Sequence, residues 1–61
     1  MKTVYRVIMR ARQSDQWQIW TNYKNYDEAE MAARGLITGG KATEAHIWQV
    51  SIADKRIVAR V

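Results

Sequence analysis

One segment of the sequence has a clear helical pattern and constrains the fold most: residues 25–40, Asn-Tyr-Asp-Glu-Ala-Glu-Met-Ala-Ala-Arg-Gly-Leu-Ile-Thr-Gly-Gly. Asn25 is a good N-cap, because its side-chain oxygen can accept from the free amides of the first turn. Glu28, three residues later, gives an arrangement similar to a capping box. Gly39 and Gly40 can end the helix in the left-handed conformation. One face of the helix is apolar, because small and aliphatic residues recur at three- and four-residue spacing: Ala29, Ala32, Ala33, Leu36 and Ile37.

The remaining segments are rich in residues that favour β-strands. We expect strands over residues 3–12, 16–23, 44–52 and 56–61, with a polar turn at 13–15 and a tight turn at 53–55. The element order is then ββαββ, in one domain spanning residues 1–61. Placing the third strand beside the first makes all neighbours antiparallel. The predicted fold is therefore α+β, with a four-stranded antiparallel sheet in the order 2-1-3-4 and one helix on one face.

The chain is small and basic, which limits its core and its function. It has 61 residues and a net charge of +4, and a domain of this size buries only about 60% of the surface of its unfolded chain. Without cysteine to form disulfides, a small domain often depends on association, so we expect a homodimer. The lack of cysteine and of a long apolar run predicts a cytoplasmic protein without a membrane segment.

Alternation along the strands predicts which side chains face the helix, if the first turn has three residues. The expected helix-facing set from the first two strands is Tyr5, Val7, Met9, Ala11, Trp17, Ile19, Thr21 and Tyr23. From the last two strands it is His46, Trp48, Val50, Ile52, Ile57, Ala59 and Val61. The opposite, open face then carries arginines, amides and a few apolar residues, with no Asp or Glu at its strand positions.

Three features that suggest chemistry have simpler explanations. The run from Gly35 to Lys41 matches Gly-x-x-x-x-Gly-Lys, but Ala42 stands where a phosphate-binding loop needs Ser or Thr, and the run ends a helix instead of starting one. His46 is the only histidine and has no evident catalytic or metal-binding partners. The carboxylates of the first helical turn fit the helix dipole. We therefore expect no enzyme activity, small-molecule substrate, cofactor or metal.

The favoured function is nucleic-acid binding by the open face, with DNA preferred over RNA. Arginine matches phosphate and guanine, and glutamine can read adenine. An exposed tryptophan among arginines can stack on a base or wedge between bases. The candidate residues are Arg6, Arg10, Arg12, Gln18, Trp20, Gln49, Arg56 and Arg60.

The alternative is a homodimeric protein-binding module, or a phage-type inhibitor that uses the same face against an acidic protein surface. Its basis is an apolar group on the open face whose members are candidates for the dimer contact: Ile8, Trp20, Ile47 and Val58. A small basic chain without a catalytic set also suits a phage or mobile-element accessory protein. Salt-dependent binding to nucleic acid, or a two-fold contact through this face, would separate the two functions.

Three short pieces of the sequence loosely resemble small DNA-binding domains of plant ethylene-response factors and of some phage integrase arms. The pieces are Tyr5-Arg6, Trp17 and the run 26–33. Those domains place arginine and tryptophan on a three-stranded sheet packed on one helix. In this sequence the helix follows two strands, and two more strands follow the helix. The resemblance implies a sheet that reads DNA, without assigning a role to any single residue.

Overall fold

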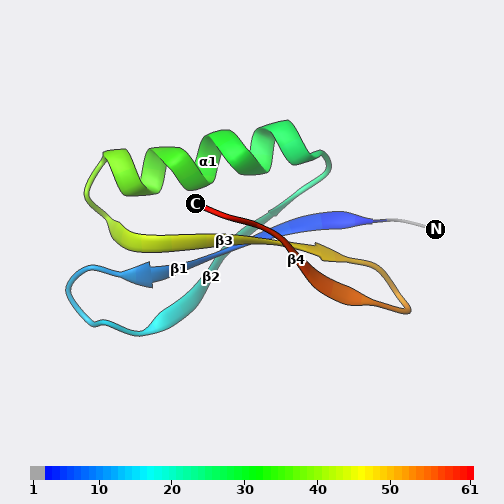
Figure 1. Cartoon of the computed structure of the whole chain (residues 1–61), viewed down its shortest axis with the longest axis horizontal. Coiled ribbons are helices and arrows are strands. Elements are labelled where there is room, and N and C mark those ends of the chain that lie inside the picture. Colours follow the sequence, from blue (N-terminus) through cyan, green and yellow to red (C-terminus); the bar gives the residue numbers. More distant parts are fainter. Residues whose placement is uncertain (1–2) are drawn as a thin grey trace.

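A computed structural model describes residues 3–61 of the chain. Its elements are β1 (Val4–Ala11), β2 (Trp17–Tyr23), α1 (Tyr26–Thr38), β3 (Ala42–Val50) and β4 (Lys55–Arg60). All neighbouring strands are antiparallel and their order is β2-β1-β3-β4, which confirms the predicted fold. The helix lies on one side of the sheet, and the β1–β2 and β3–β4 connections lie at opposite ends of the molecule (Figure 1).

The helix begins and ends as its sequence predicts. The Asn25 side chain accepts a hydrogen bond from the Glu28 amide, at 2.9 Å between nitrogen and oxygen. At the other end, the amides of Gly39 and Gly40 donate to the carbonyls of Gly35 and Ile37. Gly40 adopts a φ of +78°, a left-handed conformation that favours glycine and turns the chain into β3.

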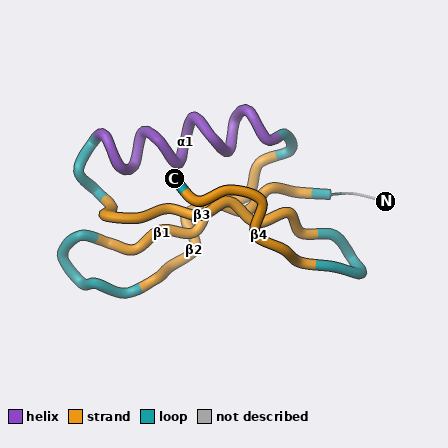
Figure 2. The backbone as a smooth tube through the Cα atoms, viewed as in Figure 1, coloured by secondary structure: helices purple, strands orange, loops and turns teal. Residues whose placement is uncertain are grey.

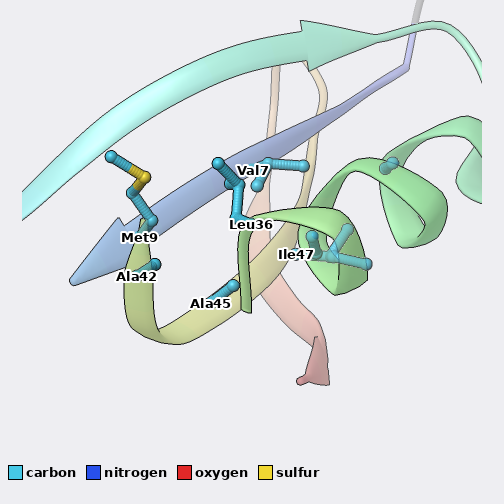
Figure 3. Close-up of a cluster of buried hydrophobic side chains, with 8 residues drawn as sticks. Val7, Met9, Leu36, Ala42, Ala45 and Ile47 are labelled. Carbon is cyan, nitrogen blue, oxygen red and sulfur yellow. The ribbon is translucent and has the colours of Figure 1, made fainter. Parts of the chain in front are cut away.

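The core between helix and sheet is built from small side chains (Figure 3). Ile47 and Val7 are its largest fully buried side chains. Half of the buried set is alanine, from both the helix and β3; the set is Val7, Met9, Ala29, Ala33, Leu36, Ala42, Ala45 and Ile47. Because alanine ends at Cβ, the helix and the sheet pack closely here, and the aromatic rings of Tyr5, Tyr23 and Tyr26 pack against the buried set while remaining partly exposed.

In β1 the predicted orientation is confirmed, whereas in β3 it is wrong. Val7 and Met9 face the helix, so Arg6 and Arg10 face away from it. Ile47, which was expected on the open face, lies opposite Val7 and is fully buried in the core. The expected core residues of β3 are turned to the other face: His46, Trp48 and Val50. The alanine-lined core accepts Ala45 and Ile47 instead of the larger Trp48.

A β-bulge reverses the predicted orientation of the first half of β2. Thr21 lies opposite Val7 but Ile19 lies opposite Ile8, so Trp20 is an extra residue between them. Trp17 and Ile19, expected in the core, therefore face away from the helix and are 43% and 62% exposed. The turn is also longer than predicted, because the Ala11 amide pairs with the Gln16 carbonyl.

A second bulge changes the orientation within β4. Ala59 lies opposite Ile47 while Ile57 lies opposite Trp48, which leaves Val58 as the extra residue. Ala59 packs against the core as predicted, but the prediction for Ile57 is wrong because it shares the face of Trp48. Ile52, also expected on the core side, lies between the paired residues Ser51 and Asp54 and is 88% exposed.

Candidate functional site

The open face of the sheet is the side that α1 does not cover (Figure 2). The strand register places fourteen residues there: Val4, Arg6, Ile8, Arg10, Trp17, Ile19, Asn22, Glu44, His46, Trp48, Val50, Lys55, Ile57 and Arg60. Half of them are large apolar residues. The solvent side of an antiparallel sheet is ordinarily polar, so this apolar fraction is unusual and makes the open face the candidate binding surface.

The structure brings together only part of the predicted site. Arg6, Arg10, Arg60 and Ile8 lie on the open face. Arg12 follows the end of β1 and lies in the β1–β2 loop. Four predicted residues lie elsewhere: Gln18, Gln49 and Arg56 share the register of the helix side, and Ile47 is buried in the core. The prediction of eight binding residues on one surface is therefore wrong for those on the helix side.

Arg10 is held by two carboxylates at one end of the face. Its Nε lies 2.7 Å from Asp15 Oδ1, and its Nη1 lies 3.2 Å from Glu44 Oε2. The guanidinium lowers the pKa of Asp15 through this contact, and both carboxylates raise the pKa of Arg10. The expectation of a face without acids is thus wrong, because Glu44 lies opposite Arg10 on it. With two acidic partners, Arg10 is a poor candidate for a phosphate contact.

Trp20, predicted as the stacking residue, is directed elsewhere. The Nζ of Lys41 lies 5.5 Å from the centroid of the Trp20 ring, within the range of a cation–π contact. Lys41 belongs to the connection between α1 and β3, where its amide donates to the Leu36 carbonyl. Trp20 is therefore oriented toward the C-terminal end of the helix. Val58, another predicted contact, is exposed as the extra residue of its bulge.

The aromatic side chains of the open face are Trp17, His46 and Trp48, all of which were predicted to lie in the core. The rings of Trp17 and His46 have centroids 4.6 Å apart and are tilted by 38°. Because β1 separates β2 from β3, the Trp17 ring reaches across β1 to contact His46. Trp48, half-buried, lies opposite Arg6 and Ile57 on the same face. The many alanines of the helix and of β3 are the sequence signal that excludes such rings from the core.

A hollow of about 270 Å³ lies in the open face. Its lining comes from all four strands: Arg6, Ile8, Ile19, Trp48, Val50 and Lys55. The Arg6 side chain in this lining is oriented by a hydrogen bond, since its Nε donates to Asn22 Oδ1 at 3.0 Å. The Trp48 Nε1 is buried and has no acceptor within residues 3–61.

Residues 3–61 lack two features that would indicate other functions. No three side chains among His, Cys, Asp and Glu are grouped closely enough there to hold a metal ion. The one helix of this part of the chain is too short and too polar to cross a membrane.

No known protein family matches the chain, and no curated protein or solved structure is significantly similar to it. The open face, where apolar side chains, a hollow and basic residues lie together, is the candidate functional site of the chain.

Proposed function

We propose that this chain is a non-enzymatic binding protein whose open face binds an acidic surface of another protein. The observation that carries the proposal is an apolar surface that also carries cations. Ile8, Ile19, Trp48 and Val50 form its centre. Arg6, Lys55 and Arg60 are basic residues of the same face, and the described residues contain no ion pair to any of the three. Such a surface supplies apolar burial and selects a partner of opposite charge.

An acidic partner fits this face better than a second copy of the chain does. In a face-to-face homodimer, the same three cations would be present on both sides of a partly desolvated contact, which opposes association. The chain as a whole also carries a net charge of +4. We therefore favour another protein with carboxylates around an apolar centre, and treat self-association as an outcome of the test.

Nucleic-acid binding is the second candidate, and the aromatic rings of the open face favour it. Trp17, His46 and Trp48 lie on the same face as Arg6 and Arg60, and aromatic rings beside cations are how single strands are bound. Three free cations would give a slope of log affinity against log salt of about −2 to −3. The protein partner is favoured because the aliphatic residues of the face add apolar burial but provide no aromatic ring on which a base can stack.

Fluorescence of the native tryptophans provides the test. A synthetic peptide that alternates Glu with Leu should bind at micromolar to millimolar concentration, at about 50 mM salt, while a peptide with Lys in place of Glu should not. The Ile57→Glu variant should lose at least about tenfold in affinity, because it places a carboxylate in the apolar surface. Met31→Glu is the matched control, since Met31 is exposed on the helix.

Other results would replace the proposal. Binding of a mixed-sequence single strand without binding of the acidic peptide would support nucleic-acid binding. A dimer in sedimentation velocity that Ile57→Glu dissociates, while Met31→Glu does not, would show self-association and overturn the acidic-partner proposal. Circular dichroism of each variant verifies that it is folded.

A further inference from the structure

We propose that the hollow in the open face is an anchor pocket for one apolar side chain of the partner with a carboxylate side chain next to it. The inference rests on the proposed function and specifies the chemistry of the segment that is bound. Its basis is the combination of an apolar floor, two cations and an unpaired donor within one hollow.

The size and position of the hollow suit a short piece of a partner chain. Pockets for drug-sized ligands usually have about 300–1,000 Å³, and this hollow has about 270 Å³, which is room for one large apolar side chain with a carboxylate beside it. Its floor consists of Ile8, Ile19, Trp48 and Val50, on three neighbouring strands of one sheet. Because paired strands hold these residues, the pocket exists before the partner binds, and little ordering is required on association.

The two cations of the pocket favour a carboxylate beside the apolar group. The Nε of Arg6 donates to Asn22, which orients the guanidinium, and no partner of its Nη groups is present in the described structure. A guanidinium that is oriented in this way can bind a carboxylate through two parallel hydrogen bonds. Lys55 lies opposite Val50 and adds a second positive charge. The lining includes no acidic residue.

Trp48 gives an independent reason to expect an acceptor in the bound segment. Its indole Nε1 is buried without a hydrogen-bond acceptor among residues 3–61, although buried donors are ordinarily paired. The same side chain lines the pocket. A carboxylate oxygen of the bound segment would supply the acceptor that this donor lacks.

A phosphate of a nucleic acid is a poorer occupant than a carboxylate next to an apolar side chain. The phosphate would contact Arg6 and Lys55, and the attached sugar and base would lie on a floor that is mostly aliphatic. Trp48 is the one ring of this lining, beside Ile8, Ile19 and Val50, so it offers a single platform for stacking. In a segment with phenylalanine or leucine next to glutamate, the apolar side chain would fill the floor of the pocket while the carboxylate reaches the cations. We therefore assign the pocket to an Asp- or Glu-flanked apolar residue within a protein chain.

Nuclear magnetic resonance of the labelled protein tests the assignment at single residues. The probe is the tetrapeptide acetyl-Glu-Leu-Phe-Glu-amide, and its neutral match is acetyl-Gln-Leu-Phe-Gln-amide. The acidic peptide should shift the Trp48 indole N–H signal and the Ile8 and Ile19 amide signals, and should bind at least about tenfold more tightly than the neutral peptide.

Two variants examine the cations separately from the apolar floor. Arg6→Gln keeps a donor that can reach Asn22 but removes the charge, and it should abolish the preference for the acidic peptide. Lys55→Gln should reduce this preference as well. Lys24→Gln removes the same charge from an exposed position between β2 and α1, away from the strand positions of the face, and should leave the preference unchanged.

The outcomes separate this inference from the proposed function. Equal affinity for the two tetrapeptides would overturn the inference, as would shifts at Trp17 and Ile57 without shifts at Trp48 and Ile8. In both cases binding of the longer Glu–Leu peptide would still support the proposed function. If neither the tetrapeptides nor the longer peptide bind, both proposals are wrong.

Discussion

Replacement of Ile47 by valine should lower the free energy of unfolding by about 1 kcal/mol, because it removes a buried methylene. Ile47 is fully buried and lies opposite Val7 on β1 and Ala59 on β4. Transfer of one methylene from water to the core contributes about 0.8 kcal/mol. The neighbouring alanines cannot extend into the space that is left, so a cavity adds to this loss.

The same substitution at Ile19 is the matched control. Ile19 lies on the open face and is 62% exposed, so scaling the methylene contribution by its buried fraction gives about 0.3 kcal/mol. Urea unfolding followed by circular dichroism would measure both variants, at two protein concentrations so that any association is detected. In a domain of this size, 1 kcal/mol corresponds to a change of about 4–8 °C in Tm. A loss for Ile19→Val as large as that for Ile47→Val would show that the faces of the sheet are assigned in reverse.

Two further predictions concern a glycine and an ion pair. Gly40→Ala should destabilise the fold by about 1–2 kcal/mol, because the φ of Gly40 is +78°. Gly35→Ala lies in the helix, with no atom within 4 Å of the added Cβ, and should stabilise the fold by up to about 1 kcal/mol. Tm shifts of the same sign for the two variants would contradict this account. Arg10 lowers the pKa of Asp15 in the folded state, so this pair stabilises the fold above the ordinary pKa of 3.8 and the contribution is lost as pH falls through the lowered value. Between pH 5 and pH 2, urea midpoints should therefore fall more for the natural chain than for Asp15→Asn, and equal falls would show that the pair contributes nothing.

Local signals in the sequence were sufficient to predict the helix, the four strands and their order along the chain. The cap at Asn25, the alanine-rich stripe and the glycines at 39–40 each act within a few residues, so the helix could be located without knowledge of the rest of the chain. Strand order followed from the requirement that neighbouring strands be antiparallel. The predicted orientation of β1 holds because its pairing with β2 and β3 leaves Val7 and Met9 on the helix side.

The faces of the other strands could not be predicted by alternation, because a bulge of one residue exchanges the two faces from that point on. Trp20 and Val58 have no local signature that distinguishes them from regular strand residues. In β3 each alternating set contains apolar and polar residues, and the set with the larger side chains, Trp48 and Val50, was assigned to the core. Side-chain volume was the better criterion for choosing the buried face of β3, because the alanine-lined helix packs against Ala45 and Ile47 and Trp48 lies on the other face. The candidate site changed with the faces, from a set of arginines and amides to an apolar surface that also carries cations.

The same bulges affect how copies of this chain can meet. Each strand pair contains one bulge, at Trp20 in β2, Thr43 in β3 and Val58 in β4. Bulges increase the local twist of a sheet, and β2 and β4, which contain two of them, are its edges. A twisted edge is a poor template for strand addition, the contact that grows into open-ended filaments. If the open face binds a partner as proposed, one partner occupies that surface and the assembly stops growing.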